Sequence, residues 1–166
     1  MTDPSMTPLS SAFPLADLPD LTVEQMWEVD RSMIEDLHIT LLQMMENAGR
    51  NLAELAPRRY EPRTCRVLAG PGGNGGGGLV AARHLANRGV DVEVVLAAPE
   101  AMTEVPGHQL DALRRMSVPV VDEPRVSAVL VDAVIAADIA VPSSVYDRFG
   151  LSLTAPFAAG TILRVR

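Results

Sequence analysis

The chain has 166 residues, of which 48% are hydrophobic and 21% charged, a balance typical of one soluble globular domain. Its net charge of −7 argues against duplex nucleic acid as a partner. All fourteen basic residues are Arg, and the absence of Lys excludes P-loop phosphate chemistry and Schiff-base or pyridoxal catalysis, which need a lysine amine.

The cysteine content and the hydropathy favour a cytoplasmic protein. A single cysteine, Cys65, cannot form an internal disulfide, so a reducing compartment is expected. The N-terminus carries no basic-then-apolar signal. The most apolar window, Val126 to Val141, is interrupted by Asp132 and Asp138, so we expect no membrane span.

The N-terminal region predicts an arm followed by a helix. Residues 1–20 contain four prolines and are expected to form an extended, mostly disordered arm, with a single nucleotide-binding domain over residues 21–166. Thr22 and Gln25 have the spacing of a capping box and predict a helix from there to about Met33.

A second capping box, Thr40 with Gln43, predicts a helix that runs to about Ala56. Gly49 lies in the middle of this helix, where glycine is unfavourable, and this indicates the close approach of another backbone. For Glu46 a solvent-facing position and a functional role are equally open.

The most informative stretch is Gly70 to Gly78, which holds seven of the twelve glycines. It lies between a predicted strand, 66–69, and a predicted helix that begins near Leu79. A strand, a glycine loop and a helix N-terminus form an anion cradle, because free backbone N–H groups and the positive end of the helix dipole face the loop. We therefore expect a nucleotide phosphate, or the sugar beside it, to bind there.

Two other interpretations of the glycine stretch are weaker. A flexible linker would carry Ser, Thr or charge and would not join a strand directly to a helix. A dinucleotide fingerprint of an ordinary NAD dehydrogenase requires an acidic residue at the end of the next strand. That strand, 90–96, is followed by a proline, and the nearest acid is Glu100, so a dehydrogenase is disfavoured.

The remaining elements predict an α/β fold. Helical spacing at 107–116 is followed by apolar runs at 118–121 and 127–132, which are expected to be the third and fourth strands. Alternating strands and helices predict a three-layer, Rossmann-like, mostly parallel sheet with helices on both faces. Ligands bind beyond the carboxyl ends of such strands, where Asp132 would share an edge with the glycine loop.

Three segments resemble the NAD(P)H-hydrate epimerase family, the N-terminal domain of YjeF-type proteins. Met45–Gly49 resembles the family's Met-Glu-Asn-Ala-Gly. Val67–Leu85 resembles its strand, its Gly-Pro-Gly-Asn-Asn-Gly-Gly-Asp-Gly loop and its Leu-Val-Ala-Ala-Arg-His-Leu helix. Val131–Ala133 resembles its Val-Asp-Ala strand end. The resemblance covers about residues 22–135 in order.

The resemblance implies an isomerase of cofactor repair. The family interconverts the two epimers of hydrated NADH or NADPH, and a partner dehydratase repairs one of them. Asn74 and Asp132 would be ligands of a structural potassium ion, and the Asp132 carboxylate would stabilise a cationic ring formed when the hydroxyl leaves. The substrate would be lined by Gly73, Asn74, Gly75, Gly76 and Gly77.

The sequence also departs from the family pattern. Gly73 stands where the family has its first loop Asn, and Gly77 stands where it has Asp. The chain after Asp132 is shorter than the pattern by about two βα units, which suggests an internal deletion. One alignment equates Ala137–Pro142 with the family's closing Asp-Ile-Gly-Ile-Pro strand; a second equates Val141–Ser144 with its Pro-Ser-Gly segment and would make Ser143 an ion ligand.

Two functions therefore stay open on the sequence. The first is a working epimerase, for which dimerisation could complete the shortened domain. The second is a non-catalytic nucleotide-binding or interaction module that has lost the loop Asp and part of the sheet.

Overall fold

The structure is a computed structural model that describes residues 21–125, 127, 129–134 and 161–164. The chain divides into two compact units, Met1–Thr40 and Leu41–Arg166, and each is described by itself. The predicted arm, 1–20, lies outside the described residues, and the predicted boundary at residue 21 stays a prediction.

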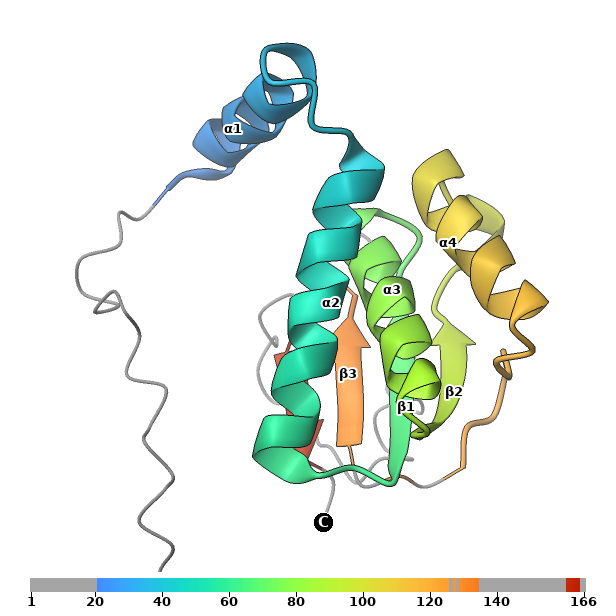
Figure 1. Cartoon of the computed structure of the whole chain (residues 1–166). Coiled ribbons are helices and arrows are strands. Elements are labelled where there is room, and N and C mark those ends of the chain that lie inside the picture. Colours follow the sequence, from blue (N-terminus) through green and yellow to red (C-terminus); the bar gives the residue numbers. More distant parts are fainter. Residues whose placement is uncertain (1–20, 126, 128, 135–160, 165–166) are drawn as a thin grey trace, which may run out of the picture. The chain divides into compact units, whose positions relative to one another are not determined.

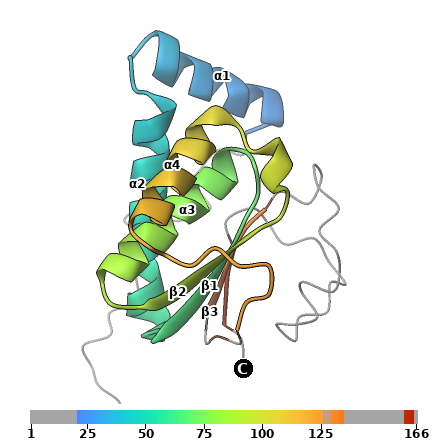
Figure 2. The same ribbon diagram turned by 90° about the vertical axis from the view of Figure 1, so that its right-hand side faces the viewer.

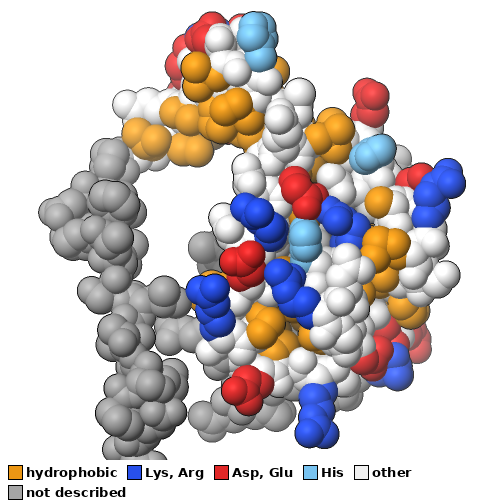
Figure 3. Space-filling view, viewed as in Figure 1, with side chains coloured by type: hydrophobic (Ala, Val, Ile, Leu, Met, Phe, Trp, Pro, Cys, Tyr) orange, Lys and Arg blue, Asp and Glu red, His pale blue; other side chains and the backbone are white. Residues whose placement is uncertain are grey.

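The described residues of the first unit, 21–40, contain one helix, α1 (Val23–Glu35). Its N-terminus is the predicted capping box: the Gln25 N–H donates to Thr22 Oγ1 at 3.3 Å, and the Thr22 N–H donates to Gln25 Oε1 at 2.8 Å. None of its residues is buried, and its apolar side chains form an exposed face (Figure 3). Trp27 on this face is 68% exposed.

The second unit is an α/β domain built on a four-stranded sheet in the order β2-β1-β3-β4 (Figure 1). The strands β1 (Thr64–Ala69), β2 (Asp91–Leu96) and β3 (Val129–Ala133) are parallel, and β4 (Thr161–Arg164) pairs antiparallel with β3. The predicted α/β class with a mostly parallel sheet is therefore confirmed.

In the described part of this unit three helices lie on one face of the sheet (Figure 2). They are α2 (Leu41–Tyr60), α3 (Gly73–Asn87) and α4 (Glu104–Arg115), with a short 3-10 turn at Pro99–Ala101 before α4. The central helix α3 contacts α2, α4 and the three parallel strands. The predicted helical layer on the second face would fall on residues outside the described part of the chain.

Two predicted boundaries are wrong in an instructive way. Helix α2 does not end at Ala56 but continues through Pro57 to Tyr60, because the proline removes only one backbone donor and the Glu61 N–H closes the last turn on the Pro57 carbonyl at 3.0 Å. Helix α3 begins at Gly73 and not near Leu79, so most of the predicted glycine loop is helical.

The predicted third strand, 118–121, is reduced to a single bridge at the sheet edge. Val94 donates its N–H to the Pro119 carbonyl at 2.9 Å and accepts from the Val121 N–H at 2.8 Å. Two hydrogen bonds hold this segment parallel to β2. This direction agrees with the mostly parallel sheet that the alternation of strands and helices predicts. No helix in the described part of the chain combines the length and hydropathy that a bilayer span requires.

Candidate functional site

The carboxyl edge of the sheet is organised by the turn Gly70–Gly72, which connects β1 to α3. The Gly70 N–H donates to the Ala133 carbonyl at the end of β3 at 3.2 Å. On the other side, both the N–H and Oγ1 of Thr103 donate to the Pro71 carbonyl at 3.1 Å. The turn is thereby fixed between β3 and the segment that leads into α4.

The predicted nucleotide-binding residues form the first turn and a half of α3. Gly72 is the N-cap, and no side chain caps this helix end. The first backbone N–H groups of a helix have no acceptor within the helix, and the helix dipole adds a partial positive charge at the same place. A helix start next to a tight turn keeps the anion-binding property that the sequence predicted, although its shape differs from an open loop.

The glycines of this segment serve two different purposes. A Cβ at Gly76 would lie 2.5 Å from Met45 Sδ, at the end of a flexible side chain that can move aside. Two other glycines are required by packing inside the protein: a Cβ at Gly75 would lie 1.8 Å from the Gly70 carbonyl oxygen, and one at Gly78 would lie 2.6 Å from the Ala133 Cβ. The expectation that ligand access explains the whole glycine run is therefore wrong for these positions.

At Gly73 and Gly77 the space beyond the missing Cβ is open. A Cβ at Gly73 would meet only Met45 Cε, at 3.9 Å, and one at Gly77 would meet nothing within 4 Å. Packing does not demand glycine at these two positions, which are the ones where the family pattern has Asn and Asp. The site can therefore accommodate both missing side chains.

The close approach predicted at Gly49 is confirmed. A Cβ at this position of α2 would lie 2.5 Å from the Gly77 carbonyl oxygen and from Val80 Cβ of α3. Helix α2 therefore touches the backbone of the candidate site directly, and Gly49 sets how closely the two helices approach.

Asp132 lies one residue before the end of β3, opposite Leu68 in the sheet register. Its side chain is only 3% exposed, and its Oδ1 accepts the Val134 N–H at 3.1 Å. This bond is typical of a residue that begins a turn. Because Val129 and Val131 belong to the core on the helical side, strand alternation directs Asp132 toward the other face.

Asn74, the other predicted ion ligand, is half-buried in the first turn of α3. The hydrogen bond between Gly70 and Ala133 joins the segments that carry Asn74 and Asp132, so both residues belong to the same edge of the sheet. Ser143 lies outside the described residues. Within the described ranges there is no group of three or more His, Cys, Asp or Glu side chains arranged to hold a metal ion.

A cluster of charged and polar side chains that the sequence did not predict joins α2 to α3, the helix that begins at the candidate site. The Glu46 carboxylate of α2 accepts a hydrogen bond from Arg83 of α3 and lies 2.7 Å from His84 Nε2. Desolvation raises the pKa of Glu46, but the His84 hydrogen bond and the Arg83 charge outweigh it and lower that pKa overall. Acidic and basic side chains accordingly mix over α2 and α3 (Figure 3). The sequence did contain a signal for this cluster, because Glu46 lies in the family motif Met45–Gly49 and Arg83 and His84 lie in the family motif Val67–Leu85.

Comparison with known proteins decides the family. The family model described as "YjeF-related protein N-terminus" matches residues 41–145, which is more than half of the chain. The chain belongs to this family. The matched range includes α2, the turn after β1, all of α3 and Asp132, so every predicted site residue lies inside it.

Two relatives of this YjeF-family chain carry names that refer to NAD(P)H-hydrate. An NAD(P)H-hydrate epimerase of Dehalogenimonas lykanthroporepellens is 45% identical over 124 residues, which are 69% of this chain and 50% of that protein. A bifunctional NAD(P)H-hydrate repair enzyme Nnr of Salinibacter ruber is 41% identical over 59% of this chain and 19% of its own length. The chain thus spans at most about half the length of these relatives.

A solved structure supports the fold of this YjeF-family domain. The crystal structure of yeast ynu0, YNL200c, superposes with a TM-score of 0.63 at 28% sequence identity, covering 71% of this chain and 57% of the yeast chain. The sheet and the helices described above are therefore the family's architecture.

Proposed function

We propose that this protein is an NAD(P)H-hydrate epimerase, an isomerase that interconverts the two epimers of hydrated NADH and NADPH. The observation that carries the proposal is the 45% identity to a named epimerase over 124 residues. The start of α3 offers backbone N–H groups for the diphosphate, and Asp132 offers a carboxylate at the neighbouring strand end.

The reaction needs no oxidant or reductant. The ring nitrogen lone pair expels the hydroxyl from the adjacent carbon, a proton joins it to form water, and the ring becomes a cation. Water then adds to either face of that carbon and returns the proton. A carboxylate beside the ring stabilises the cation relative to the neutral substrate, and this is the role we assign to Asp132.

The residues fit a potassium ion by the chemistry of their donors. Asn74 supplies an amide oxygen and Asp132 a carboxylate oxygen, and such hard oxygen ligands suit an alkali cation. The two residues contain one carboxylate, whose single negative charge balances the single positive charge of the potassium ion. When bound, the ion would supply a fixed positive charge that holds substrate oxygens in place; Asn74 and Asp132 would orient it.

The proposed partners follow from the substrate. A dehydratase that consumes one epimer would use the product of the epimerase. Several relatives are named bifunctional NAD(P)H-hydrate repair enzymes, which supports such a partner. We place the reaction in the cytoplasm, and we propose a homodimer as the assembly that could complete a shortened domain.

The test follows epimer exchange in the presence of excess dehydratase. Without epimerase, the unrepaired epimer is consumed only as fast as it interconverts spontaneously. The full chain is expected to accelerate this slow phase, and Asp132→Asn to reduce the acceleration by about 100-fold. Asp111→Asn, on the exposed side of α4 and paired with Arg115, is the matched control and should change nothing.

A second variant addresses the missing loop carboxylate. Because Gly77 faces open space, Gly77→Asp should fold normally and raise the rate by about tenfold or more through a second carboxylate at the site. If neither the native chain nor Gly77→Asp accelerates the slow phase, the epimerase proposal fails. A nucleotide-dependent rise in melting temperature under that outcome would identify the non-catalytic nucleotide-binding module instead.

A further inference from the structure

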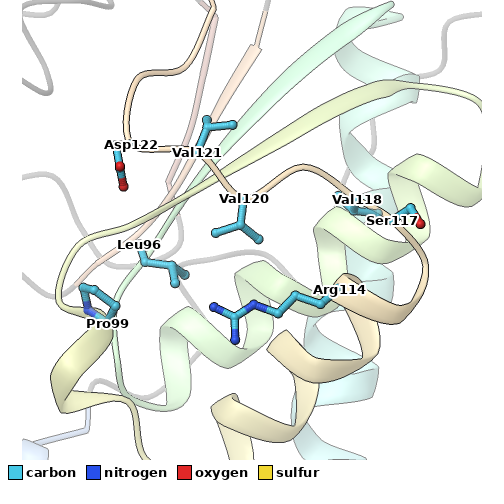
Figure 4. A pocket seen from close by; sticks show the side chains of 8 residues that line it. All are labelled: Leu96, Pro99, Arg114, Ser117, Val118, Val120, Val121 and Asp122. Atoms are coloured by element: carbon cyan, nitrogen blue, oxygen red, sulfur yellow. The ribbon is translucent and has the colours of Figure 1, made fainter.

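A second concave site lies at the edge of the sheet beside β2. It is a cleft of about 490 Å³ between α4 and the segment 118–122, and it does not include the glycine turn. Five of its eight lining residues are apolar, polar atoms supply most of the exposed lining, and the walls carry one basic and one acidic side chain (Figure 4). The lining residues are Leu96, Pro99, Arg114, Ser117, Val118, Val120, Val121 and Asp122.

The two charged side chains of the cleft come from different elements. Arg114 extends from α4 across the cleft toward Leu96 and Pro99, while Asp122 points in from the far wall beyond Val120 (Figure 4). Side chains of a helix lean toward its N-terminus, and this direction carries the Arg114 guanidinium toward the carboxyl edge of the sheet. Neighbouring Arg115, by contrast, pairs with Asp111 at 2.6 Å on the surface of α4.

We propose that this cleft binds the adenosine end of the dinucleotide substrate. The apolar side chains of the cleft suit the faces of a purine, its polar surface suits the sugar, and a guanidinium donates to ring nitrogens or stacks on the base. A carboxylate accepts hydrogen bonds from ribose hydroxyls, as acidic residues do in other doubly wound sheets. Arg114 is assigned to the base and Asp122 to the ribose.

The strand order places the three parts of a dinucleotide in sequence. The cleft lies at the carboxyl end of β2, the turn and the start of α3 follow β1, and Asp132 ends β3, in the spatial order β2-β1-β3. Neighbouring strands are about 4.8 Å apart, so the cleft and Asp132 are about 10 Å apart across the sheet. The diphosphate and two riboses of an extended dinucleotide span such a distance.

Hydrogen bonds connect the cleft to the turn. Leu96, which lines the cleft, pairs in register with Ala69, the residue before the turn. The Ala97 N–H donates to the Ala69 carbonyl at 2.9 Å, and Thr103 binds the Pro71 carbonyl. A ligand that leaves the helix start toward β2 therefore meets the wall of the cleft next. The inference rests on the proposed function only in taking a dinucleotide as the ligand.

The test measures binding of adenosine 5′-monophosphate and of its 2′-deoxy analogue to the full chain by calorimetry. The native chain is expected to bind the ribonucleotide about five- to tenfold more tightly, since one hydroxyl bond to a carboxylate is lost in the analogue. Asp122→Asn should reduce that preference to less than twofold, because a neutral amide accepts the hydroxyl more weakly.

Arg114→Gln should weaken binding of both nucleotides by about tenfold, and Arg115→Gln, the matched control, should leave both affinities unchanged. Both cleft residues are exposed, and unchanged melting temperatures would verify the folding of the variants. Equal affinity of the native chain for the two nucleotides, no binding at millimolar concentration, or an Arg114→Gln variant that behaves like Arg115→Gln would each overturn the inference.

This outcome is separable from the epimerase test. Normal epimer exchange with an inert cleft would leave the proposed function standing and remove the adenosine site. Nucleotide binding that depends on Arg114 without any epimer exchange would do the reverse.

Discussion

Neighbouring glycines in the first turns of α3 have opposite structural meanings. Gly75 is packed so closely that a Cβ would overlap the Gly70 carbonyl oxygen, whereas Gly77 has open space around its Cα hydrogen. Composition alone makes the two positions equivalent. Only the direction in which each Cβ would point separates a packing requirement from a position that is free to change.

This difference predicts opposite changes in stability. Gly75→Ala should lower the free energy of unfolding by about 2 kcal/mol or more, because the turn must move away from the helix start. Gly77→Ala should raise it by about 0.5–1 kcal/mol, since alanine restricts the unfolded chain in a helix that already accepts it. Urea unfolding followed by circular dichroism measures both, and a destabilised Gly77→Ala would contradict the open position found there.

At the scale of elements, the site depends on how α2 meets α3. Gly49 allows the close approach, Met45 fills the space over Gly76, and Glu46 joins the two helices through Arg83 and His84. The family motif in α2 is thereby explained as the complement of the motif in α3. Its residues hold the turn between β1 and α3 in place and need not touch a ligand.

The Glu46 cluster predicts a pH-dependent contribution to stability. Glu46→Gln should lower the free energy of unfolding at pH 7 by about 0.5–1 kcal/mol, a range discounted for the partial exposure of the carboxylate. Because the pKa of Glu46 is lowered in the folded state, this stabilisation is present above about pH 4.3 and is lost as the pH falls through the folded pKa.

The measurement is urea unfolding of both proteins at pH 7 and pH 3. The difference between them should be smaller at pH 3 than at pH 7, because the carboxylate becomes protonated as the pH falls through its lowered folded pKa. Glu54→Gln is the matched control on the same helix, since the Glu54 ion pairs with Arg58 and Arg88 measure 4.0 and 3.9 Å and should contribute little. An equal loss in the two variants would contradict a specific role for Glu46.

At the scale of the domain, a buried ion-pair network closes the end of the sheet opposite the site. Arg66 of β1 is 1% exposed, and its Nε lies 2.8 Å from the Glu93 carboxylate of β2 and donates to the Arg125 carbonyl at 3.0 Å. Glu93 in turn accepts the Arg125 N–H at 2.8 Å. Two strands and the segment before β3 are thus joined through one guanidinium.

Removing one member of this network should be costly. Arg66→Met should lower the free energy of unfolding by about 3–5 kcal/mol, because it leaves the Glu93 carboxylate buried with fewer partners. The double variant Arg66→Met with Glu93→Met should recover most of that loss, since apolar side chains of similar volume suit the buried position. Chemical denaturation of the three proteins checks this, and a double variant less stable than Arg66→Met would show that the network contributes more than charge compensation.

The sequence by itself determined the fold class, the family and the N-terminal cap of α1. These depend on local patterns: alternation in the strands, the Thr22 capping box, and motifs whose residues lie close together in the chain. It also predicted the close approach at Gly49 from the energetic cost of a mid-helix glycine. The predicted loop at 70–78 was wrong because glycine-rich segments carry little helix signal of their own.

Only the tertiary structure decided which glycines face open space, which partners Glu46 and Arg66 have, and that a cleft lies beside β2. Each of these features joins residues that are distant in the chain, such as Arg66 and Arg125. Their distances are fixed by the packing of helices and strands, which no local pattern records.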